Sequence, residues 1–125
     1  MKAPGFQGGQ KTPALTEFID IYPTLCDLAG LPKPSHLQGE SLVPLMRDPT
    51  LPGKAAAISR FRNGDTIRTD DFRYTEYTGK QGKLQAKMLY NHRTDTGEDT
   101  NIAGTPEVIA EVKQLSKQLR EGMGK

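Results

Sequence analysis

Tryptophan is absent from this sequence of 125 residues, cysteine occurs once and histidine occurs twice. The single cysteine, Cys26, excludes an internal disulfide bond. The two histidines, His36 and His92, stand far apart and have no pair of cysteines beside them, which excludes a zinc site of the usual spacing. No apolar run approaches the roughly 20 residues that cross a bilayer, and residues 1–10 lack a hydrophobic segment of the signal-peptide kind. We therefore expect the chain, as written, to be soluble and unexported.

An excess of charge of one sign is also missing. Seventeen basic and fifteen acidic residues leave a formal net charge of +2, so the bulk charge does not attract nucleic acid or an anionic membrane. Large apolar side chains are few, since Leu, Ile, Val and Phe make up one residue in five. Disorder by composition needs such scarcity together with strong self-repulsion, and the second condition is not met. The composition therefore predicts one folded but thinly cored domain.

The N-terminal part of the chain predicts one clear helix. Residues 1–13 are rich in Gly, Gln and Pro without periodicity, which is typical of an irregular segment. Apolar residues then recur at helical spacing, and we predict a helix over Ile21–Ala29, with Asp20 as its N-cap and Gly30 as its terminator. Cys26 should lie on the buried face of this helix.

The next stretch, residues 31–54, carries five prolines and should form a connector. It has room for little beyond a short helix over Ser41–Arg47, with Ser41 as its cap.

Runs of β-branched and aromatic residues after the connector predict a small sheet. The expected strands are Ala55–Phe61, Thr66–Thr69, Phe72–Thr78 and Lys87–Asn91. Asp70 and Asp71 form the tight turn between the second and third strands. Thr105 then caps a helix that has Pro106 at its first position and runs to about Glu121, with one apolar face to cover the sheet. The predicted fold class is α+β, with an antiparallel sheet of about four strands packed by a C-terminal helix.

Several residues are chemically suited to catalysis or metal binding, but each lacks a partner. Cys26 has no basic residue or histidine within helical reach, which predicts a buried structural thiol rather than a nucleophile. His36 and His92 lie in turn-like contexts, which favours solvated or capping side chains over acid–base groups. The acidic run 95–99 lacks the alternating oxygen ligands and the terminal glutamate of a calcium loop, so a solvated turn is favoured. We predict no catalytic residue and no metal site in this chain.

One group of side chains suggests a binding site. Four arginines fall on the predicted strands within a short stretch, at Arg60, Arg62, Arg68 and Arg73. The planar fork of arginine suits sulfate, phosphate or carboxylate groups, and we predict a substrate-binding role for Arg60, Arg62 and Arg68. The alternative is that interleaved carboxylates neutralise the arginines in surface ion pairs of little consequence, namely Asp65, Asp70, Asp71 and Glu76.

Three segments also carry motifs in a recognisable order. The first begins Asp20-Ile21-Tyr22-Pro23-Thr24-Leu25 and continues to Leu45. The second is Thr66-Ile67-Arg68-Thr69-Asp70-Asp71-Phe72-Arg73-Tyr74-Thr75-Glu76-Tyr77. The third is Leu89-Tyr90-Asn91, followed by Asp95, Glu98 and Asn101-Ile102-Ala103. From about Gln10 onward, the chain resembles the C-terminal part of type I sulfatases, close to the iduronate-2-sulfatase-like bacterial members.

This resemblance implies that the chemistry lies outside the chain. Sulfatases of this type hydrolyse sulfate esters with a formylglycine, made from Cys or Ser in a Cys/Ser-x-Pro/Ala-x-Arg motif, on an N-terminal α/β domain that also binds calcium. Cys26 is followed by Asp27-Leu28-Ala29-Gly30 and does not match this motif. The resemblance therefore implies that formylglycine and calcium belong to a missing N-terminal domain, upstream of Met1.

The resemblance also implies a division of the chain. Residues 1–31 would be the tail end of the large alkaline-phosphatase-like α/β domain, residues 32–54 a Pro-rich connector, and residues 55–125 the C-terminal subdomain. The expected function is to shape the substrate cleft of a sulfatase that acts on sulfated glycans, without activity alone. The full-length parent would be periplasmic or secreted. The alternative is a free-standing module that binds a sulfated glycan or another polyanion through Arg60, Arg62 and Arg68.

The expected partner is the missing N-terminal sulfatase domain. Without that domain, four apolar side chains should be partly uncovered, namely Leu15, Phe18, Tyr22 and Leu25. Because uncovered apolar surface drives association, we expect the chain to self-associate through residues 10–31. Nucleic acid and membrane partners are not expected.

Overall fold

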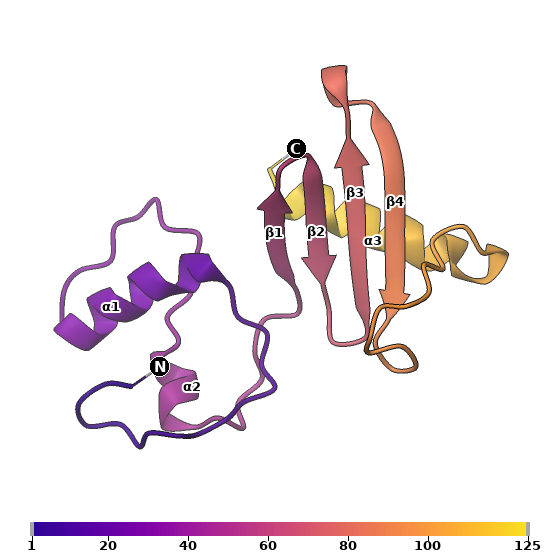
Figure 1. The fold of residues 1–125 in the computed structure, drawn as a ribbon. Coiled ribbons are helices and arrows are strands. Elements are labelled where there is room, and N and C mark those ends of the chain that lie inside the picture. Colours follow the sequence, from indigo (N-terminus) through magenta and orange to yellow (C-terminus); the bar gives the residue numbers. More distant parts are fainter. Residues whose placement is uncertain (1, 125) are drawn as a thin grey trace. The chain divides into compact units, whose positions relative to one another are not determined.

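The structure, a computed structural model, describes residues 2–124. It divides the chain into two units, residues 1–54 and residues 55–125 (Figure 1). The first unit contains the 3-10 helix η1 (Phe18–Asp20) and the helices α1 (Ile21–Ala29) and α2 (Val43–Arg47). The second unit contains a sheet and the helix α3 (Ile109–Gly122). None of the helices within residues 2–124 is both long enough and apolar enough to cross a bilayer.

Helix α1 has the bounds that the sequence predicts. Gly30 adopts φ 65°, a left-handed conformation that glycine accepts without strain. The N–H of Gly30 donates to the carbonyl of Asp27 at 3.2 Å, and the N–H of Leu31 donates to the carbonyl of Cys26 at 2.9 Å. These bonds satisfy the last carbonyls of the helix and end it at Ala29. Cys26 is buried, as predicted, with 5% of its surface exposed.

The predicted caps of α1 and α2 need correction. Asp20 is the N-cap residue of α1, but its side chain makes no capping bond to that helix. Its carboxylate instead accepts the backbone N–H groups of Glu17 and Glu40, each at 2.8 Å. Helix α2 begins at Val43 rather than Ser41, and the Ser41 hydroxyl accepts the N–H of Val43 at 3.3 Å. Buried carboxylates bind whichever donors reach them, and sequence spacing does not reveal a donor twenty residues away.

The second unit is a four-stranded antiparallel sheet in the order β1-β2-β3-β4 (Figure 1). Its strands are β1 (Ala57–Phe61), β2 (Gly64–Arg68), β3 (Phe72–Thr78) and β4 (Leu84–Asn91). The predicted sheet is confirmed, but β1 starts two residues later, β2 two residues earlier and β4 three residues earlier than expected. The three added residues of β4, Leu84, Gln85 and Ala86, are exposed. They alternate apolar and polar, so the sequence pattern could have extended this strand to Leu84.

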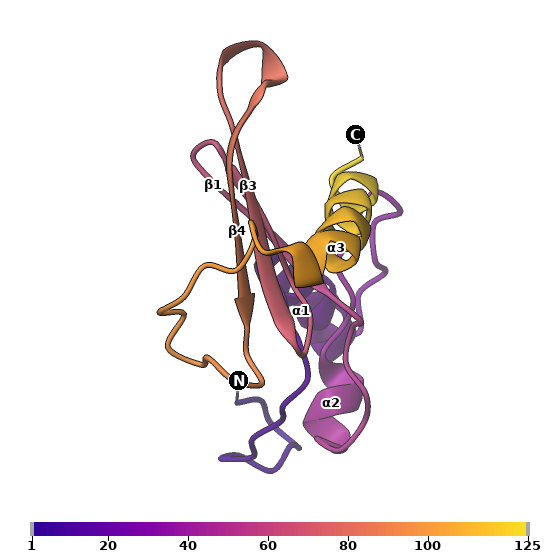
Figure 2. The same cartoon turned by 90° about the vertical axis from the view of Figure 1, so that its right-hand side faces the viewer.

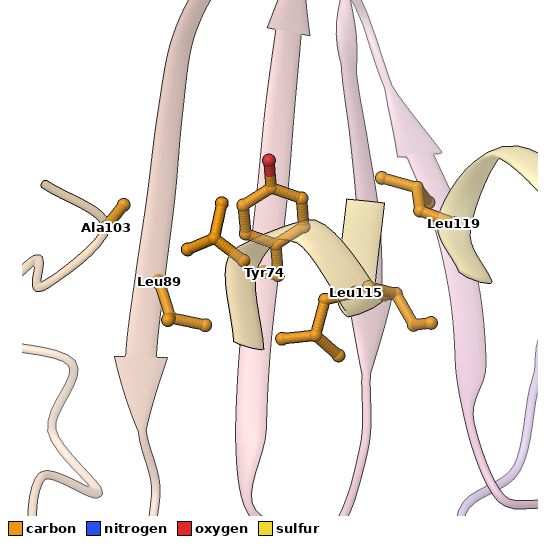
Figure 3. Packing of buried hydrophobic residues seen from close by; sticks show 7 residues of the cluster. Tyr74, Leu89, Ala103, Leu115 and Leu119 are labelled. Atoms are coloured by element: carbon orange, nitrogen blue, oxygen red, sulfur yellow. The ribbon is translucent and has the colours of Figure 1, made fainter. Parts of the chain in front are cut away.

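Helix α3 covers one face of this sheet, as predicted (Figure 2). The first turn of the predicted helix is a separate 3-10 helix, η3 (Pro106–Val108), as is frequent at the N-termini of α-helices. The sheet contributes Ile67, Tyr74 and Leu89 to the core, and α3 contributes Val112, Leu115 and Leu119 (Figure 3). Ala103 closes the core from the loop after β4 (Figure 3).

The strand register fixes which side chains share a face. Ile58 pairs with Ile67, and Ile67 pairs with Tyr74, so these residues point toward α3 together with every second neighbour. Arg60, Asp65 and Glu76 therefore lie on the same face as the core. We call the opposite side the open face of the sheet; it carries Phe61, Gly64, Thr66, Arg68, Arg73, Thr75, Tyr77, Met88 and Tyr90.

Candidate functional site

The three predicted binding arginines do not converge on one site. Arg60 lies on the helix face of β1, where its guanidinium forms a double hydrogen bond with Asp65 at 2.6 and 3.0 Å. Arg68 lies on the open face. Arg62 lies in the turn between β1 and β2, with its guanidinium carbon 5.4 Å from the centroid of the Phe61 ring. Each arginine therefore presents its charge in a different direction.

Arg68 is held by the hairpin between β2 and β3. Its guanidinium donates to the carbonyls of Thr69, Asp70 and Phe72, the last two at 3.2 and 3.3 Å. The N–H of Thr69 donates to the carbonyl of Phe72, which closes the turn. Because one side chain serves three carbonyls of this turn, Arg68 stabilises the hairpin of the predicted Asp70-Asp71 turn.

A cluster of charged side chains joins the open face to the loop after β4. Glu98 accepts a hydrogen bond from Arg73 at 2.5 Å and lies 2.8 Å from the Nε2 of His92. Burial opposes the charge of Glu98, but the hydrogen bonds from Arg73 and His92 outweigh it and lower the pKa of the carboxyl group. His92 thus has a partner within the loop that the sequence analysis did not identify, and Glu98 also joins this loop to Arg73, 25 residues away.

The same loop is fastened at two further points. Asp95 accepts the N–H groups of Asp99 and Thr100 at 3.0 and 2.9 Å, which makes the acidic run a hydrogen-bonded turn. The side-chain oxygen of Asn101 accepts the N–H groups of Leu89 and Ala103 at 2.9 and 3.1 Å. The motif residues Asp95, Glu98 and Asn101 therefore shape the loop and its attachment to β4.

The second unit contains a buried polar network that the sequence analysis did not predict. The buried carboxylate of Glu76 accepts hydrogen bonds from Tyr74 at 3.0 Å and from Ser116 of α3 at 2.5 Å. Burial, followed by the contact with Glu76, raises the pKa of the Tyr74 hydroxyl. Arg120 of α3 lies 3.6 Å from the second oxygen of Glu76. Strand alternation alone could have placed Glu76 on the helix face, beside Tyr74, although not Ser116 opposite it.

These residues border a hollow of about 340 Å³ between the sheet and the end of α3. Asp65 and Glu76 line it together with Leu119 and Arg120. Both carboxylates already have cationic or hydroxyl partners, so the hollow offers no charge left to compensate a ligand.

A second buried network holds the first unit together. Lys54 donates to Asp20 at 2.6 Å and to Glu17 at 2.5 Å. Burial opposes the charge of Asp20, but the hydrogen bonds from Lys54 and from the backbone of Glu40 and Glu17 lower the pKa of its carboxyl group. Thr24 donates to the carbonyl of Asp20 at 2.5 Å and accepts the N–H of Leu42. This network ties α1 to the residues before α2.

The described residues offer little to a metal ion. Within residues 2–124, no three or more His, Cys, Asp or Glu side chains form a group that would hold a metal. Cys26 is a buried free thiol, and His36 is exposed.

The first unit also leaves a large apolar surface uncovered. Phe18 is 91% exposed, and five further apolar side chains of the same stretch are exposed, namely Ile19, Ile21, Tyr22, Leu25 and Leu31. Phe18, Tyr22 and Leu25 follow helical spacing, so they form one exposed stripe. The predicted partial exposure of four side chains is confirmed, since Leu15 is half-buried and Phe18, Tyr22 and Leu25 are exposed. We call this surface the α1 apolar stripe.

Comparisons of the sequence with known proteins find similarity to sulfatases. The family described as "N-sulphoglucosamine sulphohydrolase, C-terminal" matches residues 1–125. Arylsulfatase K of Rattus norvegicus is 34% identical over 134 residues, which cover 96% of this chain and 23% of that protein. The chain therefore spans about a quarter of the length of this relative.

Two solved structures share the fold. Phosphonate monoester hydrolase SpPMH from Silicibacter pomeroyi has a TM-score of 0.80 at 26% identity, covering 98% of this chain and 28% of that chain. BT4656, solved in complex with its substrate D-glucosamine-2-N, 6-O-disulfate, has a TM-score of 0.70 at 27% identity. That similarity covers 82% of this chain and 22% of that chain.

Proposed function

Because the chain belongs to the family of N-sulphoglucosamine sulphohydrolase C-terminal domains, we propose that it shapes the substrate cleft of a sulfatase and has no activity alone. The observation that carries the proposal is the family match over residues 1–125, combined with coverage of only 23% of arylsulfatase K. The hairpin motif around Arg68 supports an iduronate-2-sulfatase-like parent, and we propose sulfated glycans as the substrates of that parent.

The residues of this chain do not fit the groups that sulfatase chemistry uses. Cys26 is buried on the inner side of α1, and Gly30 stands where the formylglycine motif has its arginine. The carboxylates Asp20, Asp65 and Glu76 are each bound to partners of the fold, and no metal-holding group exists within residues 2–124. We therefore assign formylglycine and calcium to the catalytic domain of the parent, which we propose to be periplasmic or secreted.

The α1 apolar stripe supports the presence of such a domain. A helix with apolar side chains on both its inner and outer sides is normally buried on both sides. The inner side of α1 packs through Pro23, Thr24 and Cys26, whereas Tyr22 and Leu25 on the outer side stay exposed. We propose that the catalytic domain covers the stripe in the parent, and that a second copy of the chain covers it when the chain is alone.

A second substrate class deserves a test because of one structural similarity. The structure with a TM-score of 0.80 is a phosphonate monoester hydrolase, and it matches 98% of this chain. Phosphonate monoesters, like sulfate esters, present an anionic tetrahedral centre with a single ester bond. Assays of the parent should therefore include both esters.

The alternative function is that of a binding protein, a free-standing module that holds a polyanion. The sequence analysis based it on a surface shared by Arg60, Arg62 and Arg68. The geometry does not support such a surface, because Arg60 pairs with Asp65 and Arg68 binds the hairpin carbonyls. Arg62 is the member of the three without a hydrogen bond or ion pair among the described residues, so this alternative rests on the Arg62 turn.

The DNA immediately upstream of the Met1 codon tests the proposed function. The proposal predicts a continuous open reading frame that encodes a Cys/Ser-x-Pro/Ala-x-Arg motif on an α/β domain. A stop codon followed by a ribosome-binding site would contradict it and favour the free-standing module.

A further inference from the structure

One end of the sheet combines an exposed aromatic ring with unpaired cations. Phe61 is 76% exposed at the end of β1, and the Arg62 guanidinium lies over its ring at 5.4 Å. The backbone of Arg62 has φ 54°, a left-handed conformation that is unusual for a residue other than glycine. The β1–β2 turn adopts this conformation at Arg62. An aromatic ring this exposed contributes little to folding and is available for binding.

A second turn brings more positive charge to the same end. The antiparallel order places the β3–β4 turn at the same end as the β1–β2 turn (Figure 1). The N–H of Thr78, the last residue of β3, donates to the carbonyl of Asn63 in the β1–β2 turn at 2.9 Å. The β3–β4 turn carries Lys80 and Lys83, both exposed.

These cations are not neutralised by the fold. Arg62, Lys80 and Lys83 make no ion pair with any residue that the structure describes, and the turn segments 61–63 and 79–83 contain no acidic residue. By contrast, Arg60, Arg73 and Arg93 are each paired with a carboxylate. The end of the sheet is thus a patch of free positive charge on a chain whose net charge is only +2.

The open face extends the apolar part of this patch. In the strand register, Phe61 pairs with Gly64 and Gly64 pairs with Tyr77, so all three share the open face. Tyr77 Cε1 lies 2.9 Å from the position that a Cβ on Gly64 would occupy. Because Gly64 has no side chain, the Tyr77 ring packs over the Gly64 backbone, which is buried. The rings of Phe61 and Tyr77 therefore lie on the open face on either side of Gly64.

We propose that Phe61, Tyr77, Arg62, Lys80 and Lys83 form a binding site for a sulfated saccharide. The C–H face of a sugar ring packs on an aromatic ring, and the guanidinium and ammonium groups donate to sulfate oxygens. The Arg62 guanidinium covers one side of the Phe61 ring, and the 76% exposure leaves the other side open for the sugar. The choice of a sulfated ligand rests on the proposed function, since aromatic rings and cations alone also suit other anions.

The test is isothermal titration of the chain with a heparin-derived oligosaccharide at low ionic strength. The proposal predicts binding that weakens about threefold to tenfold in Phe61→Ala and in Arg62→Ala, as expected for the loss of one aromatic or charge-assisted contact. Two matched controls should leave the affinity within about twofold, because their side chains are exposed on α3. These are Lys113→Ala, which removes one positive charge, and Ile109→Ala, which removes one apolar side chain.

Four results would overturn the proposal. The first is the absence of binding. The second is Phe61→Ala binding as tightly as the unsubstituted chain, which would mean that charge alone attracts the ligand. The third is a loss of affinity in Lys113→Ala as large as that in Arg62→Ala. Equal affinity for a single-stranded DNA oligonucleotide, with the same loss in Phe61→Ala, would also overturn it in favour of a nucleic-acid site. None of these results bears on the upstream reading frame, so failure of the site is distinguishable from failure of the proposed function.

Discussion

Asn101 shows how a single motif residue supports the second unit. Its side-chain oxygen accepts two backbone N–H groups, and its Nδ2 donates to the carbonyl of Lys87 at 3.2 Å. Asn101 thereby supplies β4 with the hydrogen bonds that a neighbouring strand would make. We predict that Asn101→Ala lowers the free energy of unfolding by about 1–3 kcal/mol, because a part-buried N–H on β4 loses its acceptor.

Urea denaturation followed by circular dichroism measures this effect. The control is Gln114→Ala, an exposed amide on α3 that should change the free energy of unfolding by less than about 0.5 kcal/mol. An equal free energy of unfolding for Asn101→Ala and the unsubstituted chain would show that the loop after β4 packs on β4 without the Asn101 side chain.

Lys54 and Asp20 give a second test at the scale of residues. The Asp20 side chain is fully buried, and Lys54 supplies its positive partner at 2.6 Å. We predict that Lys54→Met destabilises the first unit by about 3 kcal/mol, since it leaves the buried carboxylate without a counter-charge. The double variant Asp20→Asn/Lys54→Met should recover part of the loss, because it removes the charge as well. A double variant less stable than Lys54→Met would contradict this pairing.

The lowered pKa of Asp20 also sets a dependence on pH. Since the pKa of the folded state lies below the ordinary value of 3.8, the ion pair contributes its full stability above that value. This contribution is lost as the pH falls below 3.8 and through the pKa of the folded state. Urea unfolding measures the free energy of unfolding at pH 7 and at pH 3. The decrease between these two pH values should be smaller for Asp20→Asn than for the unsubstituted chain. An equal decrease in both proteins would show that folding does not change the pKa of Asp20.

At the scale of elements, α3 supplies the core contacts that the sheet needs. Leu115 is 1% exposed and packs among Ile67, Tyr74 and Leu89 (Figure 3). We predict that Leu115→Ala costs about 2–5 kcal/mol, which is a large part of the stability of so small a unit. Ile109→Ala on the exposed side of α3 is the matched control, with an expected effect below about 0.5 kcal/mol. Thermal unfolding gives the melting temperatures of both variants, and Leu115→Ala should melt at a lower temperature than Ile109→Ala. Similar melting temperatures would contradict the packing of α3 on the sheet.

The elements also show where sequence reasoning succeeds and where it stops. Local signals placed α1 and β3 with their observed bounds, because Gly30 ends one and a run of aromatic and β-branched residues marks the other. The start of β4 was missed, although apolar and polar residues alternate from Leu84 to Met88. Local signals also grouped Arg60 with Arg68, which the register places on opposite faces. Pairing partners such as Glu98 and Arg73 depend on tertiary contacts, which local patterns do not encode.

At the scale of the whole molecule, the α1 apolar stripe predicts association of the isolated chain. Sedimentation velocity over increasing concentration should show a shift from monomer to larger species, because exposed apolar stripes bury each other. The double variant Phe18→Ser/Leu25→Ser should shift the equilibrium toward the monomer, whereas Ile109→Ser should not, although Ile109 is also exposed. A monomer at all concentrations in the parent chain would show that the stripe is not an association surface.

We propose that this chain shapes the substrate cleft of a sulfatase without supplying its catalytic groups, and a turnover assay of the isolated chain tests this proposal. The purified chain, with calcium present, is incubated with an aryl sulfate and with a sulfated oligosaccharide, and sulfate release is compared with that of Cys26→Ala. We expect no sulfate release above the rate of this variant, because the Cys26 thiol is buried and the carboxylates Asp20, Asp65 and Glu76 are bound to partners of the fold. Sulfate release by the unsubstituted chain that disappears in Cys26→Ala would contradict the proposal, since it would make Cys26 the nucleophile.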